Sequence, residues 1–154
     1  MDTGDLINTL NGHQKSVFSI CISHDNKKII SGSRDHSIKI WDLETGVLIN
    51  TLDGHQHGVF SVCISHDNKK IISGSWDHSI KIWDLDTGVL INTLDGHQHS
   101  VFSVCISHDN KKIISGSDDH SIKIWDLETG DLINTLDGHQ NSVLSVCLSN
   151  GNDI

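Results

Sequence analysis

Serine, histidine and aspartate recur in this chain of 154 residues in a fixed order that could support hydrolysis. A histidine that joins a serine hydroxyl to a carboxylate through its two ring nitrogens is the arrangement found in serine hydrolases. All three residue types return in each of three copies of a repeated segment. No Gly-x-Ser-x-Gly elbow exposes any of these serines. Three identical sets favour a repeated structural network over one catalytic centre, and we predict that the chain is not an enzyme.

Metal binding is the second chemistry to weigh, because the chain contains twelve histidines. Two pairs, His55 with His57 and His97 with His99, place imidazoles two residues apart. The first histidine of each pair already belongs to a Ser-His-Asp set, and structural zinc sites usually need four ligands, often including thiolates. We therefore expect no metal site and no cofactor.

The four cysteines stand one per repeat in the same apolar run, as Cys21, Cys63, Cys105 and Cys147. The sequence contains no Cys-x-x-Cys, and equivalent positions in stacked repeats do not form a disulfide framework. We expect small thiols that fill a strand position.

Composition excludes two classes of partner. The net charge of −9 argues against nucleic acid, because phosphate binding needs a clustered positive surface. No apolar run approaches the roughly 20 residues that span a bilayer, which argues against a membrane protein. The first five residues are acidic where a signal peptide would be basic, so we expect a cytoplasmic chain.

Near-exact internal repetition organises the whole chain. The stretch from Lys28 to Leu43 returns at 70–85 and at 112–127, so that Trp41, Trp83 and Trp125 stand 42 residues apart. A Gly-His pair follows the same period at Gly12, Gly54, Gly96 and Gly138. Such a period indicates one supersecondary unit stacked on copies of itself.

Each unit contains four short runs that read as β-strands, separated by turns. In the first unit the runs are 16–23, 28–33, 37–41 and 47–52, with Asn26 and Gly46 at turn positions that favour positive φ. Lone runs at 5–10 and 142–149 correspond to the last and the first strand of a unit. The sequence predicts an all-β fold with fourteen strands.

The pattern Gly-His … Ser-Gly-Ser-x-Asp-His-Ser-Ile-Lys-Ile-Trp-Asp resembles the WD40 repeat. The resemblance implies a β-propeller of four-stranded antiparallel blades around a channel, with about three and a half blades in this chain. It covers a single array over 1–154, with full repeats at 5–46, 47–88 and 89–130 and a partial repeat at 131–154. One departure is the turn between the first two strands, where His24 and Asn26 replace the usual Pro and Gly.

Similarity to the family also implies a buried hydrogen-bond network in each blade, which runs from a tryptophan through serine and histidine to aspartate. The implied members are Trp41, Ser31, His13 and Asp35, then Trp83, Ser73, His55 and Asp77, then Trp125, Ser115, His97 and Asp119. Its role would be structural, since breaking it would leave buried polar groups unpaired.

Positions that differ between near-identical repeats carry the functional signal. Arg34, Trp76 and Asp118 occupy one slot in the turn that precedes the third strand. In a propeller this turn lies on the face that family members commonly use for partners, near Phe18, Phe60 and Phe102 at the channel mouth. We expect these six residues to form a contact face for a protein or peptide; neutral drift at exposed turns is the alternative.

Three blades cannot close a ring, because propellers have about four blades or more. Two chains supply six full blades and two junctions, where 142–149 of one chain could pair with 5–10 of the other. The sequence thus predicts a homodimer with eight blade places. We expect a non-catalytic interaction scaffold that assembles into a closed ring; the alternative is a designed or recently amplified fragment whose only activity is this homo-oligomeric assembly.

Overall fold

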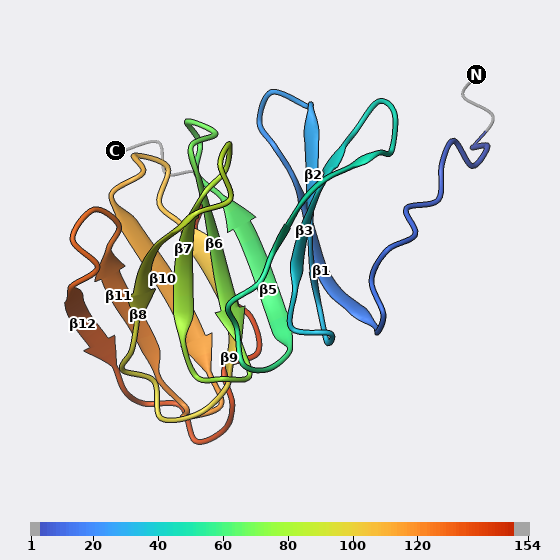
Figure 1. Cartoon of the computed structure of the whole chain (residues 1–154). Helices are drawn as coiled ribbons and strands as arrows, with labels where there is room; N and C mark the ends of the chain where they lie inside the picture. The colour runs from blue at the N-terminus through green and yellow to red at the C-terminus, as the bar shows by residue number, and fades with distance from the viewer. Residues whose placement is uncertain (1–3, 150–154) are drawn as a thin grey trace.

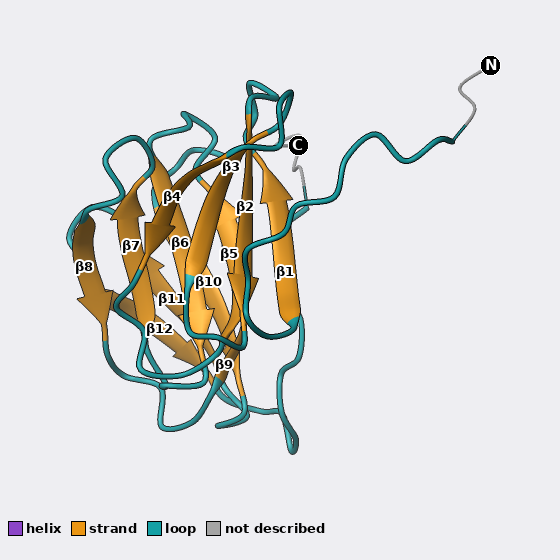
Figure 2. Ribbon diagram, turned by 45° about the vertical axis from the view of Figure 1, so that its right-hand side comes forward, coloured by secondary structure: helices purple, strands orange, loops and turns teal. Residues whose placement is uncertain are grey.

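Three four-stranded antiparallel sheets make up the computed structural model, which describes residues 4–149 (Figures 1 and 2). This confirms the all-β fold. The first sheet contains β1 (Val17–Ile22), β2 (Lys28–Ser33), β3 (Ile38–Asp42) and β4 (Leu48–Leu52). The second contains β5 (Val59–Ile64), β6 (Lys70–Ser75), β7 (Ile80–Asp84) and β8 (Leu90–Leu94). The third contains β9 (Val101–Ile106), β10 (Lys112–Ser117), β11 (Ile122–Asp126) and β12 (Leu132–Leu136).

Sequential strands pair in each sheet because tight turns join them. Asn26 adopts φ 56° in the turn between β1 and β2, as expected for an asparagine there. His36 adopts φ 74° between β2 and β3, a left-handed conformation that is uncommon outside glycine. Gly46 supplies φ 72° between β3 and β4, in a loop where Asp42 Oδ1 accepts hydrogen bonds from the backbone and hydroxyl of Thr45.

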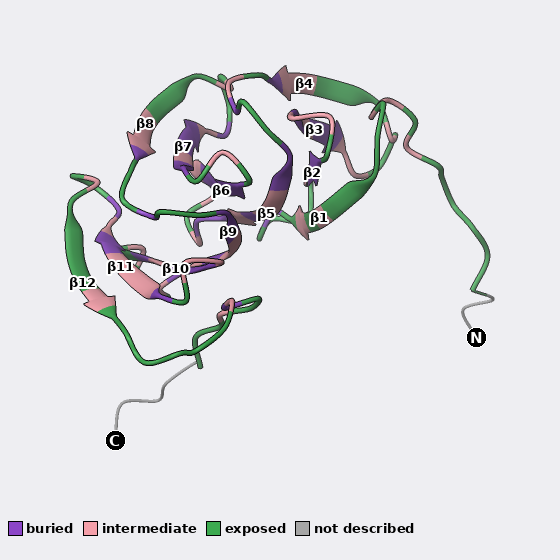
Figure 3. Cartoon of the chain, turned by 90° about the horizontal axis from the view of Figure 1, so that it is seen from below, coloured by how far each residue is buried: buried purple, intermediate pink, exposed green. Residues whose placement is uncertain are grey.

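The sheets follow one another around an arc, with β1, β5 and β9 on the inner side and β4, β8 and β12 on the outer side (Figure 3). Two apolar cores fill the spaces between neighbouring sheets. In the first core, Ile30, Ile38 and Leu52 of one sheet pack against residues such as Val59 and Trp83 of the next. We call each sheet a blade. The apolar cores lie between neighbouring blades and not within a single blade.

The lone runs at 5–10 and 142–149 are not strands, so the expectation of fourteen strands is wrong for the described residues, which contain twelve. The physical reason is that a strand is defined by its ladder, and within residues 4–149 neither segment has a neighbouring strand to pair with. The last five residues of the partial repeat, 150–154, lie outside the described residues.

Both lone segments nevertheless occupy the positions that the corresponding strands have in the complete repeats. Asn8 Nδ2 donates to the carbonyl of Thr45 at 3.1 Å, as Asn50 Nδ2 does to Thr87 at 3.4 Å. At the other end, the backbone N–H of Val146 donates to Ser103 Oγ at 3.1 Å, and β5 and β9 make the same bond to the preceding blade. The 5–10 segment therefore lies at the position of an outer strand, and the 142–149 segment lies at the position of an inner strand.

Candidate functional site

Each blade contains a hydrogen-bonded row of Trp, Ser, His and Asp side chains, which the second blade illustrates. Trp83 Nε1 donates to Ser73 Oγ at 2.9 Å. His55 Nε2 lies 2.7 Å from the same oxygen, and His55 Nδ1 lies 2.7 Å from Asp77 Oδ2. β6 supplies the serine, β7 the tryptophan, and the loops before β5 and after β6 supply the histidine and the aspartate.

The other two blades repeat this geometry. In the first, the bonds join Trp41 to Ser31 at 2.9 Å, Ser31 to His13 at 2.8 Å and His13 to Asp35 at 2.9 Å. In the third, they join Trp125 to Ser115 at 2.9 Å, Ser115 to His97 at 2.7 Å and His97 to Asp119 at 2.7 Å. The structure thus brings together all twelve residues of the three sets.

Donor counting fixes the two ends of each row. The indole N–H of Trp83 can only donate, so Ser73 Oγ accepts from it. The ionised carboxylate of Asp77 can only accept, so His55 Nδ1 donates to it. Ser73 is 0% exposed, so its oxygen cannot meet a substrate. This geometry supports a structural role for the row over a nucleophilic one.

The aspartate at the end of each row is ionised and fully bonded. Burial by itself would raise the pKa of Asp77, but hydrogen bonds from His55, from the Ser79 hydroxyl and from the backbone N–H of Gln56 hold that pKa far below its ordinary value. The pKa values of Asp35 and Asp119 are lowered in the same direction: burial raises them, and hydrogen bonds, of which those from the Ser37 and Ser121 hydroxyls have the largest effect, lower them by more. Burial also lowers the pKa of His97, against the opposing effect of Asp119, so the neutral imidazole is favoured there.

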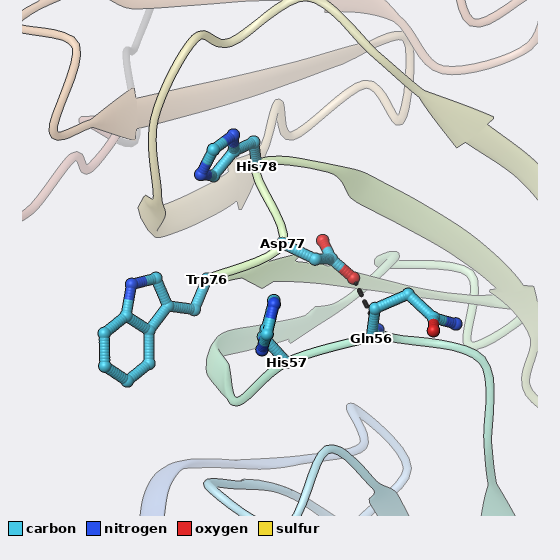
Figure 4. A pocket seen from close by; sticks show the side chains of 5 residues that line it. All are labelled: Gln56, His57, Trp76, Asp77 and His78. Carbon is cyan, nitrogen blue, oxygen red and sulfur yellow. Dashed lines mark hydrogen bonds between the residues drawn. The ribbon is translucent and has the colours of Figure 1, made fainter.

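A pocket of about 490 Å³ opens on the face formed by the loops before β5 and after β6 (Figure 4). Its lining includes His57 and Trp76, and the Trp76 side chain is 50% exposed. The backbone N–H of Trp76 donates to the carbonyl of Gly58 at 2.9 Å, which holds the two loops together. Figure 4 shows the indole directed away from Asp77, whose carboxylate accepts from the backbone of Gln56. The most exposed tryptophan of the described chain therefore borders a concave site.

The three phenylalanines of the expected contact face form a continuous row beside this pocket. The rings of Phe18 and Phe60 stack with centroids 4.9 Å apart, and Phe60 meets Phe102 edge-on at 5.1 Å. Trp76 joins the row through Phe60 at 5.9 Å. Four aromatic side chains from three blades thus share one surface.

The two charged members of the expected face lie differently. Arg34 is exposed in the first blade, and its backbone N–H donates to the carbonyl of Ser16 at 2.8 Å. Asp118 is half-buried, because its carboxylate accepts a hydrogen bond from the hydroxyl of Ser142. Asp118 therefore fastens the 142–149 segment as well as facing solvent.

Sequence reasoning missed a row of histidines on the turns between the first two strands of the blades. The ring centroids of His24 and His66 lie 4.6 Å apart, and those of His66 and His108 lie 4.7 Å apart. Desolvation, followed by the charges of its two neighbours, lowers the pKa of His66. The sequence signal for this row is the 42-residue spacing of the three histidines, because equivalent side chains of consecutive repeats lie next to one another.

Neither histidines nor thiols gather as metal ligands in residues 4–149: no group of three His, Cys, Asp or Glu side chains is placed to hold an ion. The four cysteines are free thiols. Burial raises the pKa of Cys21 to about 12 and that of Cys105 to about 11, which disfavours the reactive thiolate. In the same described range, no helix is long and apolar enough to cross a membrane.

Comparison with known proteins identifies the architecture. The family model described as "WD domain, G-beta repeat" matches residues 4–42, 46–84 and 88–126. The vegetative incompatibility protein HET-E-1 of Podospora anserina is 53% identical over 34 residues, which are 22% of this chain and 2% of that protein.

Two solved structures, titled "Structure of U3-55K" and "Crystal structure of RRP9 WD40 repeats", each match with a TM-score of 0.86 and 30% identity. The match covers 88% of this chain and 43% of each of theirs, so the chain spans less than half of either solved chain. With three matched repeats and three sheets that superpose on propeller blades, the chain belongs to the WD40 repeat family.

Proposed function

We propose that this chain is a non-catalytic scaffold that binds a protein or peptide through the aromatic face around Trp76. WD40 repeat domains are generally scaffolds of this kind. The observation that carries the proposal is the row of Phe18, Phe60, Phe102 and Trp76 beside a pocket. Tryptophan is a favoured interface anchor, and its exposure here is otherwise unfavourable.

The test compares Trp76→Ala with a matched control on another surface. Ile91 is 51% exposed on the outer strand β8, close to the 50% of Trp76. Proteins captured from host extract by the wild-type chain are identified, and the affinity of each purified candidate is measured for both variants. A true partner loses affinity for Trp76→Ala and keeps it for Ile91→Ala. Equal affinities would overturn the assignment of the face, and an absence of any specific partner would favour the amplified or designed fragment.

We further propose that two copies close one ring, and the carrying observation is the bare face of the first blade. Ile20 and Ile22 of β1 are 68% and 51% exposed. Their equivalents in β5, Val62 and Ile64, are 5% and 6% exposed because the preceding blade covers them. Exposed apolar patches of this kind drive association.

In such a dimer each junction place would hold the 142–149 segment of one copy on its inner side and the 5–10 segment of the other on its outer side. Neighbouring strands lie about 4.8 Å apart, so the first and fourth strand positions of a blade are about 14 Å apart. The 142–149 and 5–10 segments could pair directly only if one of them moved from its position.

Light scattering tests the closure. The wild-type chain should have twice its chain mass of 17.0 kDa, and Ile20→Glu should reduce it to one. If the wild type and the variant both have the mass of a single chain, the dimer is refuted.

A further inference from the structure

The near-identical repeats differ in charge on one face of the molecule. Between the copies at 11–52 and 53–94, three differences exchange a charged residue for an uncharged one, namely Asn11 for Asp53, Lys15 for His57 and Arg34 for Trp76. All three positions lie in the loop before the first strand of a blade or in the turn after its second strand, and in the second blade these loops line the pocket. The first blade is therefore more cationic on this face than the second.

The change continues in the same direction from the second blade to the third. Asp118 stands at the position of Trp76, Asp95 is exposed, and the same loops of the third blade contain no Lys or Arg. In the first blade, Lys15 and Arg34 are both exposed, and neither forms an ion pair within the described residues. The aspartate of the Trp-Ser-His-Asp row is present in every blade, so it does not contribute to the difference. The face thus changes from cationic to acidic across the three blades.

The charged ends of this face and its aromatic centre are held by the same loops. A Cβ on Gly58 would lie only 3.3 Å from the Cα of Arg34, and the carbonyl of Gly58 accepts from the backbone N–H of Trp76 at 2.9 Å. The backbone N–H of Asp118 donates in the same way, at 2.9 Å, to the carbonyl of Ser100, which is the equivalent of Gly58. The row of phenylalanines also extends over all three blades. One position of the repeat therefore presents a cation, an indole and a carboxylate in successive blades.

We propose that this face binds an extended peptide segment with acidic residues at one end, apolar residues in the middle and basic residues at the other, and that the acidic end lies over the first blade. The inference rests on the proposed scaffold function and names the chemistry of its partner. Trp76 and the phenylalanines anchor the apolar part. The charged ends set the orientation, because complementary charges contribute specificity more than affinity. Packed sheets lie about 10 Å apart, so about six residues of extended chain span the roughly 20 Å from the first blade to the third.

Uniformly charged partners do not fit this face. A nucleic acid or an acidic peptide would meet the like charges of Asp95 and Asp118 at the third blade. A basic peptide would meet the like charges of Lys15 and Arg34 at the first blade. Like charges that face each other across an interface cost affinity, so only a segment that carries both signs in this order is complementary to the whole face.

The probes are fluorescently labelled synthetic peptides, titrated with the full 154-residue chain and followed by anisotropy. The polarised peptide is Glu-Glu-Ser-Leu-Leu-Leu-Ser-Lys-Lys, and it is also made in the reverse order, since either chain direction can place the acidic end over the first blade. We expect saturable binding of at least one order, which Trp76→Ala weakens at least about tenfold. A peptide of equal composition in which acidic and basic residues alternate at both ends should bind more weakly at low salt.

Double-mutant cycles test the polarity. Replacement of both Glu residues of the peptide by Gln should weaken binding to the wild-type chain about two- to fivefold at low salt and should cost nothing further on the Lys15→Gln/Arg34→Gln chain. Replacement of both Lys residues by Gln should behave in the same way with the Asp95→Asn/Asp118→Asn chain. Each peptide change should be additive with the chain change at the other end, because those groups do not interact. High salt should reduce both couplings, since it screens exposed charges.

Matched controls remove the same charges from the opposite ends of the blades. Lys27→Gln/Lys111→Gln changes two exposed lysines in the turns after the first strand. Glu44→Gln/Asp131→Asn changes two exposed acids in the loops after the third strand. Both control chains should bind every peptide as the wild type does.

The outcomes separate this inference from the proposed function. If Trp76→Ala weakens binding but the cycles are additive at both ends, the polarity is overturned and the aromatic contact face stands. Peptide binding that Trp76→Ala leaves unchanged would overturn both. If no peptide binds saturably, the partner class is overturned, and the affinities of captured partners still test the proposed function. A mass by light scattering that is lower for Lys15→Gln/Arg34→Gln than for the wild type would show that the face binds a second copy, and would overturn the peptide.

Discussion

Gly32 lies directly against Val59 of the next blade, where a Cβ would stand only 2.8 Å from the valine Cγ1 and 3.0 Å from Cγ1 of Val62. Both valines are buried and sit on an inner strand held by its ladder. The second blade repeats this contact between Gly74 and Val101. The glycine of the repeated Ser-Gly-Ser triplet is thus what lets neighbouring blades approach closely.

We expect Gly32→Ala and Gly74→Ala each to lower the free energy of unfolding by about 1–3 kcal/mol through overpacking. Gly116→Ala should cost less, because its neighbour Val143 belongs to a segment that is not held in a sheet. Urea denaturation followed by tryptophan fluorescence measures all three. Equal losses for the three variants would contradict the proposed role of the inner-strand ladder.

A second prediction concerns the buried serine of the network. Ser73→Ala removes the hydroxyl that binds both the Trp83 N–H and the His55 ring, so both groups lose a partner beside the first core. We expect a loss of about 1–3 kcal/mol for each unpaired group. Ser61→Ala is the control: its oxygen accepts only one backbone N–H, that of Val104, and it should cost less. Thermal or urea unfolding of the two variants compares them.

The repeat made most of the fold readable from the sequence. The sequence correctly predicts positive φ at Asn26 and Gly46, because the asparagine side chain and the absence of a side chain on glycine decide these turns locally. The segments at 5–10 and 142–149 have a strand pattern because their residues closely match those of true strands. Local pattern cannot report a ladder partner, and that partner is what these segments lack within the described chain.

The candidate site was readable only in part. The residues of each Trp-Ser-His-Asp row follow from the resemblance to the WD40 repeat. The hydrogen bond from Ser142 to Asp118 does not, because it depends on how the chain returns after β12. The stacking of Phe18 on Phe60 depends likewise on the angle between blades. The sequence pattern cannot predict contacts that depend on tertiary geometry.

Ion pairs that join neighbouring blades should contribute little. Lys28 Nζ lies 2.7 Å from Asp86 Oδ1 and Lys70 Nζ lies 3.1 Å from Glu128 Oε2, but both acids are mostly exposed. Solvent screens such pairs, so Asp86→Asn and Glu128→Gln should each change the unfolding free energy by less than about 1 kcal/mol. Measurements at low and high salt check this. A larger loss that salt does not reduce would show that these pairs hold the blades together.

Acid should destabilise the blades in two steps, and the sign follows from the direction of each pKa shift. Burial lowers the pKa of His97 below 6.5 in the folded chain, so between these two values the unfolded chain binds more protons. Stability from this group is complete above pH 6.5 and is lost as the pH falls through the folded pKa. For Asp77 and Asp119, hydrogen bonds outweigh burial and lower the pKa from 3.8, so their stability is lost only as the pH falls below about 4.

Urea unfolding at pH 8, 6, 5, 4 and 3 tests both steps. We expect a plateau above about pH 6.5, a shallow decline below it and a steeper decline below about pH 4. Asp119→Asn, although less stable throughout, should weaken the steeper step, because an amide does not titrate while its carbonyl still accepts from His97. Stability that rises as the pH falls from 7 to 5 would contradict the lowered pKa of His97, because a group with a lowered pKa loses stability as the pH falls.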